Sequence, residues 1–145
     1  MKIFILTVLP FFIAFTTVAQ SNTKVKPKAS TSLAYLKNYD TKYPGEVKLF
    51  SKPQFVTRIK ALIGTRYTLL KNYWNVESPI EITGGNFIAY GCQQHNCDVT
   101  NFMIIYNFDN DKMYVGIREE EKVKTYSENG TPIPEKLNKW ATNNN

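Results

Sequence analysis

The sequence predicts an α+β fold: a single domain, over residues 33–140, in which a roughly five-stranded antiparallel sheet is flanked by helices. Two observations lead to this prediction. Apolar residues recur at helical spacing between Ser51 and Trp74, whereas short strand-like segments joined by tight turns follow Pro79. Consecutive strands with short links pair antiparallel, and helices grouped before the strands indicate α+β. The chain has 145 residues and is 43% hydrophobic, which suits one domain with its own core.

The first strong helix is expected to have Ser51 as its N-cap and Pro53 in its first turn. Gly64 occupies a C-cap position and ends the helical pattern. Further helices are expected over residues 66–73 and 134–140. The apolar stripe of the first helix comprises Phe55, Val56, Ile59, Leu62 and Ile63.

The second half of the chain is expected to form the sheet. Its strand-like runs are rich in β-branched and aromatic residues, and turn residues such as Gly84-Gly85 and Asn129-Gly130 separate or end them. No internal repeat at solenoid or propeller periods is present. The expected strands span residues 79–83, 86–90, 102–108, 113–118 and 123–126.

The N-terminus has the pattern of a signal peptide over residues 1–19. Lys2 supplies the positive charge, residues 3–15 form the apolar segment, and small residues precede a cleavage site at Ala19/Gln20. The alternative is a membrane anchor, but the apolar run is marginal for a span of about 20 residues. Cleavage would place the mature protein in the periplasm or the medium, where a disulfide persists.

Two polar segments flank the predicted domain. Residues 20–32 carry three lysines around Pro27 and are expected to form a flexible basic arm, and residues 141–145 to form a disordered tail.

The chain has 18 Lys and Arg against 12 Asp and Glu, a formal net charge of +6. This excess favours anionic partners such as peptidoglycan or another envelope polymer. No basic stripe with interleaved aromatics is present, so nucleic acid is not an expected partner.

The most specific feature of the sequence is the segment Cys92-Gln93-Gln94-His95-Asn96-Cys97. It holds both cysteines of the chain and its single histidine. A disulfide between the cysteines would close a small ring and stabilise by about 2 kcal/mol in the chain-entropy model. A loop that is ordered before binding loses less entropy when it docks. The ring therefore presents its imidazole on a stiff loop, although a plain loop staple with an incidental histidine is the alternative.

Other chemistry for these residues is less favoured. A structural zinc site requires four ligands and a catalytic one three, and oxidation would remove the two thiolates. A Cys/His nucleophilic pair needs a free thiolate, and a dithiol redox site usually has two intervening residues rather than four. The segment Asp109-Asn110-Asp111 lacks the glycine and distant glutamate of a calcium loop. With no paired carboxylates, phosphate-binding glycine loop or Ser/His/Asp set, we expect no metal, no cofactor and no enzymatic activity.

An export signal, a helix and strands around a Cys-x-x-His-x-Cys ring resemble the inhibitor of vertebrate lysozyme (Ivy) family of exported bacterial proteins. The resemblance is sharpest from Tyr90 to Cys97 and in the following hairpin. It implies a five-stranded antiparallel sheet flanked by helices, usually in a homodimer. The best-known loop of this family reads Cys-Lys-Pro-His-Asp-Cys, so Gln93, Gln94 and Asn96 stand where that loop has Lys, Pro and Asp.

The resemblance implies an inhibitory role for the ring. In the family the disulfide-closed loop plugs the lysozyme cleft and its histidine hydrogen-bonds to the two catalytic carboxyl groups, a role that would fall here on His95, with Cys92 and Cys97 holding the loop. The expected partner is a lysozyme-like glycoside hydrolase, either a c-type lysozyme or an autolysin. The alternative function is a non-catalytic envelope-binding protein that kept the scaffold without inhibitory activity.

Overall fold

The computed structural model describes residues 32–120 and 122–143. The described chain forms an α+β domain with a six-stranded antiparallel sheet, as the sequence predicted in outline. The α-helices are α1 (Pro53–Ile63), α2 (Arg66–Tyr73) and α3 (Glu135–Thr142), and the 3-10 helices are η1 (Ala34–Tyr39), η2 (Leu49–Ser51) and η3 (Glu128–Gly130). The strands are β1 (Val76–Glu77), β2 (Glu81–Thr83), β3 (Asn86–Cys92), β4 (Thr100–Asn107), β5 (Lys112–Glu119) and β6 (Lys122–Ser127).

The six strands form only five rows of the sheet, because β1 and β2 pair with the same neighbour. The order β1-β3-β4-β5-β6 holds along the sheet, and β2 pairs with the same strand β3 as β1 does. Val76 lies opposite Cys92 at one end of β3, and Ile82 lies opposite Phe87 near the other. The first edge strand is therefore broken between β1 and β2. This break explains why the sequence predicted five strands: β1 has two residues and no pattern of its own.

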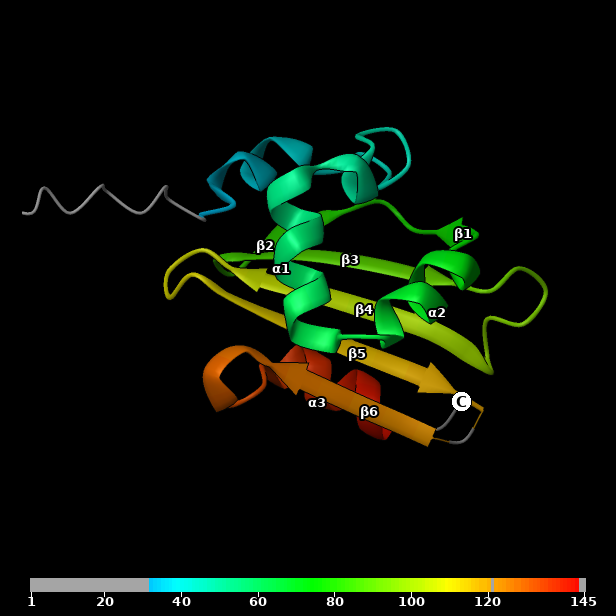
Figure 1. Cartoon of the computed structure of the whole chain (residues 1–145). Coiled ribbons are helices and arrows are strands. Elements are labelled where there is room, and N and C mark those ends of the chain that lie inside the picture. The colour runs from blue at the N-terminus through cyan, green and yellow to red at the C-terminus, as the bar shows by residue number, and fades with distance from the viewer. Residues whose placement is uncertain (1–31, 121, 144–145) are drawn as a thin grey trace, which may run out of the picture.

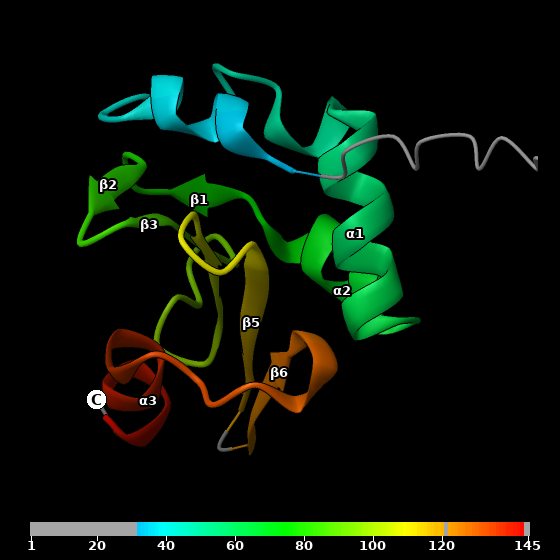
Figure 2. The ribbon, with the colours of Figure 1, turned by 90° about the vertical axis from the view of Figure 1, so that its left-hand side faces the viewer.

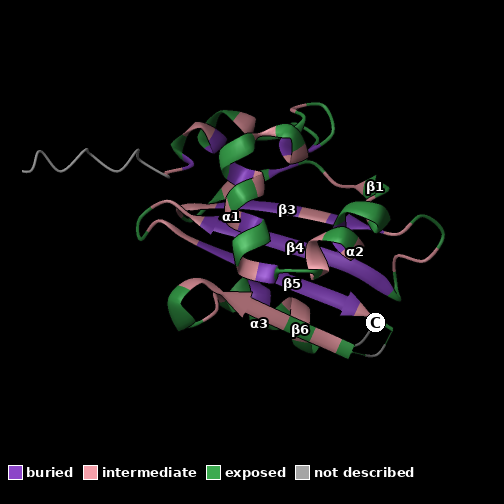
Figure 3. Cartoon of the chain, viewed as in Figure 1, coloured by how far each residue is buried: buried purple, intermediate pink, exposed green. Residues whose placement is uncertain are grey.

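The helices cover the two faces of the sheet unequally. Helices α1 and α2 pack on one face and α3 packs on the other, so the molecule has three layers (Figures 1 and 2). The central strands β4 and β5 are buried along almost their whole length (Figure 3). Residues such as Phe102 and Ile104 face α1 and α2, whereas Met103 and Ile105 face α3. Successive side chains of β4 therefore pack alternately into two separate hydrophobic cores, one on each face of the sheet.

Helix α1 forms where its apolar stripe was predicted. Phe55, Ile59 and Ile63 are buried, at the spacing that places them on one face of a helix. Gly64 follows the last helical residue with φ 57°, a conformation that glycine adopts without strain. The predicted N-cap is wrong by one residue: the cap is Lys52, whose side chain makes no capping bond, and Pro53 begins the helix.

Two glycines let tryptophans approach the sheet closely from opposite faces. A Cβ on Gly91 of β3 would lie 2.2 Å from the ring of Trp74, and a Cβ on Gly116 of β5 would lie 2.2 Å from the ring of Trp140. Both tryptophans follow or belong to a helix that covers the sheet, α2 and α3 respectively. Glycine is needed at both strand positions because any larger residue would push its helix away from the sheet.

Helix α3 is longer than predicted, so the expected tail begins too early. Ala141 and Thr142 are helical, and the Thr142 hydroxyl donates to the backbone carbonyl of Asn138. Arg118 donates to the carbonyl oxygens of Trp140 and Asn143, at 2.8 and 2.9 Å. These carbonyls lie at the helix C-terminus, where a positive charge is favourable. These bonds hold the C-terminal end of α3 against β5, past the point at which the apolar pattern of the helix stops.

The predicted signal peptide, residues 20–31 of the predicted arm and residues 144–145 lie outside the described residues. Within residues 32–120 and 122–143, no helix combines the length and the apolarity that a membrane span requires.

Candidate functional site

The segment singled out by the sequence forms the connection between β3 and β4 and extends beyond the end of the sheet (Figure 1). The backbone N–H of Gln93 donates to the carbonyl of Thr100 at 3.0 Å, which closes the base of the loop. Gln94 and His95, at its tip, are exposed, whereas Gln93, Asn96 and Cys97 are half-buried (Figure 3). The loop is therefore presented to solvent and is not covered by its neighbours.

The two cysteines are joined. The Sγ atoms of Cys92 and Cys97 are bonded, with the Cα atoms 4.9 Å apart, and neither cysteine of the chain is free. Cys92 is the last residue of β3 and is buried, so the bond ties the loop to the end of a central element of the sheet. A disulfide removes the thiolates that metal, nucleophilic and redox chemistry at these residues would need. Among residues 32–120 and 122–143, no three His, Cys, Asp or Glu side chains cluster as metal ligands do.

The ring has its own hydrogen bonds in addition to the disulfide. The N–H of Asn96 donates to the carbonyl of Gln93 at 3.0 Å, the bond of a four-residue turn. The side chains repeat the link, because Asn96 Nδ2 donates to Gln93 Oε1 at 3.1 Å. Gln93 and Asn96 thus form a neutral pair at the positions where the loop Cys-Lys-Pro-His-Asp-Cys has a lysine and an aspartate.

His95 occupies the third position of this turn, and its backbone φ is 62°. Residues with a side chain rarely adopt this left-handed conformation, which costs about 1–2 kcal/mol. The disulfide and the turn hydrogen bond hold His95 there. The imidazole makes no hydrogen bond or ion pair with any residue in the described part of the chain. Both ring nitrogens are therefore available to a partner.

Asn101 supports the ring from strand β4. Its Nδ2 donates to the carbonyl of Cys97 at 2.6 Å, and the residue lies directly opposite Cys92 in the sheet. The residue is 2% exposed. Asn101 was not among the predicted site residues. The only signal in the sequence is an asparagine beside a run of aromatic and β-branched residues, and the contact itself depends on the pairing of β4 with β3.

Apolar side chains lie exposed near the base of the loop. Val76 is 41% exposed and pairs with Cys92, and Val99, within the loop connection, is 36% exposed. Tyr73, at the C-terminal end of α2, is 39% exposed, and Figure 1 places α2 and β1 at the same end of the sheet as the loop. Exposed apolar side chains grouped beside a protruding loop are typical of a protein-binding surface.

The family comparison matches residues 54–145 with the model described as inhibitor of vertebrate lysozyme (Ivy). This match covers more than half of the chain and includes the disulfide ring. The chain belongs to the Ivy family. The searches of curated proteins and of solved structures returned no match.

Membership of the Ivy family confirms the resemblance seen in the sequence. Ivy family members are lysozyme inhibitors and not enzymes, in agreement with the expectation of no enzymatic activity, and the family implies binding to lysozyme. The disulfide favours a location outside the cytoplasm, and Ivy inhibitors are typically periplasmic. Residues 32–53, which contain η1 and η2, lie outside the matched region.

Proposed function

We propose that this protein is an exported inhibitor of a lysozyme-like muramidase and that it acts by inserting the Cys92–Cys97 ring into the enzyme's active-site cleft. The observation that carries the proposal is the exposed imidazole of His95 at the tip of a disulfide-closed loop. A stiff loop of this kind loses little conformational entropy on docking, so more of its contact energy contributes to affinity.

The chemistry of the cleft suits an imidazole. Lysozyme-type hydrolysis depends on two carboxyl groups, one protonated and one ionised, on either side of the sugar bond. The two nitrogens of His95 lie on opposite sides of a flat ring, so that one side chain can hydrogen-bond to both carboxyl groups. In that position the side chain also fills space that the substrate would occupy.

The base of the loop adds contacts of a different kind. Val76 and Val99 are the exposed apolar residues nearest the ring along the chain and in the sheet. They would cover the rim of the cleft while the ring enters it, an arrangement in which apolar contacts surround a central polar anchor. This surface supports the insertion of the whole loop end rather than contact by the imidazole alone.

The net charge bears on the choice of partner. The chain carries a formal charge of +6, and cleavage after residue 19 would remove only Lys2 from this excess. A strongly basic lysozyme would be repelled at long range, which slows association by about tenfold or more at low salt. A muramidase of low or negative net charge, such as an autolysin, is the better electrostatic match.

The experiment is a peptidoglycan lysis assay with muramidases of differing net charge. The variants are His95→Ala and, as a matched control from the same loop tip, Gln94→Ala. We expect the wild-type protein to inhibit at least one enzyme and His95→Ala to weaken inhibition on the order of 10- to 100-fold, the value of hydrogen bonds to charged groups. Gln94→Ala should inhibit almost as well as wild type, since Gln94 has no described hydrogen-bond partner.

Two results would overturn the mechanism. Equal inhibition by wild type and His95→Ala would remove the imidazole from it. Absence of inhibition across the whole panel would favour the alternative, a non-catalytic envelope-binding protein. Sedimentation with purified sacculi at two salt concentrations would then test that alternative, because an electrostatic mode must weaken as salt increases.

A further inference from the structure

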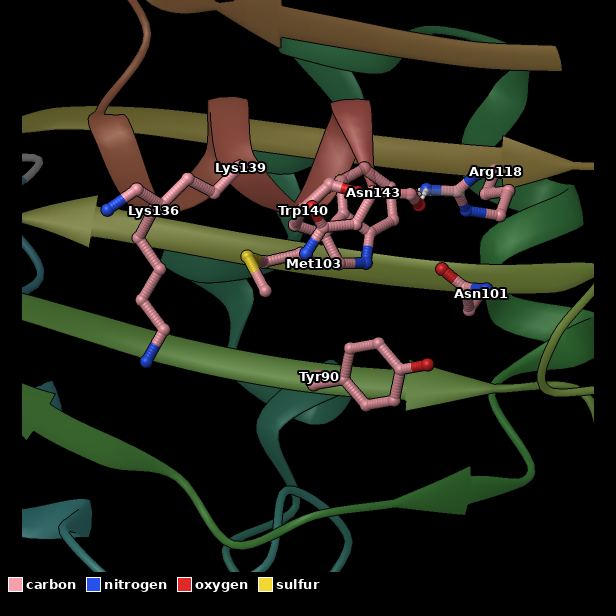
Figure 4. A pocket seen from close by; sticks show the side chains of 8 residues that line it. All are labelled: Tyr90, Asn101, Met103, Arg118, Lys136, Lys139, Trp140 and Asn143. Atoms are coloured by element: carbon pink, nitrogen blue, oxygen red, sulfur yellow. Dashed lines mark hydrogen bonds between the residues drawn. The ribbon is translucent and has the colours of Figure 1, made fainter. Parts of the chain in front are cut away.

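A hollow of about 280 Å³ lies on the α3 face of the sheet, close to the end where the disulfide ring begins. Figure 4 shows that its lining comes from four elements: Tyr90 from β3, Asn101 from β4, Arg118 from β5 and Trp140 from α3. Met103 forms part of its floor. The hollow is separate from the loop tip, and it has two unusual polar groups.

The first polar group is a buried cation. Arg118 is 8% exposed, and both of its described hydrogen bonds use Nη2, which donates to the carbonyls of Trp140 and Asn143. The N–H groups on Nε and Nη1 have no partner in the described part of the chain, and none of the described carboxylates pairs with this guanidinium. The guanidinium also lies over the Trp140 ring, 5.3 Å from its centroid, but this contact supplies no counter-charge. A buried charge is costly unless it is paired, so this side of the hollow favours an anion.

The second polar group is a buried acceptor. Asn101 Oδ1 is buried and has no hydrogen-bond partner in the described structure. The orientation of this amide is fixed, because a carbonyl only accepts and the atom bonded to the Cys97 carbonyl must therefore be Nδ2. A buried acceptor without a partner costs about 1–3 kcal/mol, so this position favours a ligand that donates an N–H or O–H.

The two groups are neighbours. Asn101 and Arg118 are directly opposite each other in the β4–β5 register, and residues in that relation point to the same face of the sheet. Tyr90 projects its hydroxyl toward the Asn101 side of the same space, as Figure 4 shows. A ligand that satisfies both groups carries an anionic group for Arg118 and, close to it, an N–H or O–H donor for Asn101.

We propose that this hollow binds the carboxylate end of an N-acyl amino acid, the C-terminal residue of a peptide. The carboxylate pairs with the N–H groups on Nε and Nη1 of Arg118 and accepts from the Tyr90 hydroxyl. The amide N–H donates to Asn101 Oδ1, and a small side chain packs on Met103 and Trp140. An anion without a donor, such as acetate, would leave Asn101 unsatisfied, and a neutral amide would leave Arg118 without a counter-charge.

The probes are N-acetyl-L-alanine and N-acetyl-D-alanine, titrated into the ¹⁵N-labelled full chain and followed by NMR. N-acetylalaninamide lacks the charge, and acetate lacks the donor. We expect saturable shifts at the Asn101 side-chain amide, the Arg118 Nε–H and the Trp140 indole N–H. Each comparison compound should bind at least about tenfold more weakly, as one charged or buried hydrogen bond is lost. Preference for the D form indicates cell-wall stem peptides as the source, and preference for the L form indicates protein termini.

Three variants separate binding from folding. Arg118→Gln keeps a donor for the α3 carbonyls but removes the charge, and we expect at least a tenfold loss of affinity. Tyr90→Phe keeps the packing and removes one hydroxyl, for a loss of several-fold, and it remains informative if Arg118→Gln does not fold. Lys42→Gln removes the same charge from an exposed site elsewhere and should bind as wild type does. The proposal is overturned if no probe saturates, if acetate binds as tightly as the N-acetyl amino acids, or if Lys42→Gln weakens binding as much as Arg118→Gln.

Discussion

The two connections of strand β4 lie at opposite ends of the sheet and are held in opposite ways (Figure 1). At one end, the β4–β5 turn is bonded to the rest of the domain: Arg58 of α1 reaches both Asp111 in the turn and Glu128 of η3, with N···O distances of 2.6 Å. Tyr106 also donates to Asp111, at 2.6 Å. This turn joins a helix, a hairpin and a 3-10 helix into one unit.

At the other end, the β3–β4 loop is bonded only to itself and to the strands beside it. The described hydrogen bonds of residues 93–99 end within the loop or at Thr100 and Asn101. The disulfide adds a covalent link between Cys92 and Cys97. Stiffness therefore has two sources in this molecule: contacts with the rest of the domain at the β4–β5 turn, and local closure at the β3–β4 loop. Only local closure leaves the loop tip free for a partner.

The largest effect is expected from removing the ion pairs of Arg58, which hold the β4–β5 turn against the rest of the domain. Arg58→Ala leaves the half-buried carboxylates of Asp111 and Glu128 without their cation, and we expect the free energy of unfolding to decrease by about 3 kcal/mol. The midpoint of thermal unfolding should decrease by roughly 10 °C. The control is Arg66→Ala, which removes a more exposed pair with Glu119 and should cost at most about 1 kcal/mol. Equal losses in the two variants would show that the Arg58 cluster is not a special support.

Removing the disulfide of the β3–β4 loop should reduce stability less than Arg58→Ala does, and should reduce binding more. Cys92→Ser combined with Cys97→Ser should lower the free energy of unfolding by about 2 kcal/mol, because the open chain gains conformational freedom. Inhibition or binding of the partner enzyme should weaken, since the open loop must be ordered on docking. Denaturant unfolding and titration calorimetry measure the two effects. The contrast would fail if folded Arg58→Ala lost binding while the serine variant kept it.

The pH dependence of the free energy of unfolding tests the contribution of Asp111, in the β4–β5 turn. Burial alone would raise the pKa of Asp111, but the hydrogen bonds from Tyr106 and Arg58 lower it below its ordinary value of 3.8. A carboxyl group with a lowered pKa stabilises the fold above its unfolded value, and this contribution is lost as pH decreases through the folded value. We therefore expect the free energy of unfolding to decrease between about pH 5 and pH 3 more steeply in wild type than in Asp111→Asn. Parallel slopes in the two proteins would contradict this assignment.

The sequence predicted the elements of the fold whose pattern is local. The apolar stripe of α1, the aromatic and β-branched runs of β4 and β5, and the Cys-x4-Cys ring can each be recognised within a short window. The two-residue strand β1 could not be, because Val76 and Glu77 are strand residues only through their pairing with β3. The family resemblance was visible for the same reason as the ring: the two cysteines and the histidine lie within six consecutive residues.

Long-range contacts set the features that the sequence did not reveal. Arg118 and Trp140 are 22 positions apart, and the bond between them joins the C-terminal end of α3 to β5. The link from Asn101 to the ring depends on how β4 is registered against β3. No period or spacing in the sequence encodes either contact. The hollow between these residues is therefore a property of the folded sheet, whereas the ring is a property of the chain.

The smallest effect is expected from making the β3–β4 loop stiffer than it already is. Gln94 precedes His95 in the turn, its φ is not positive, and its N–H makes no described backbone hydrogen bond, so proline fits this position. Gln94→Pro should raise the free energy of unfolding by about 0.5 kcal/mol by restricting the unfolded chain. The same restriction should lower the Kd for the enzyme about two- to threefold, mainly through slower dissociation. Proline at a turn in the β4–β5 hairpin would give no such change in Kd, because that turn lies at the far end of the sheet. A Kd that is unchanged by Gln94→Pro would mean that the disulfide and the Gln93–Asn96 pair already fix the loop completely.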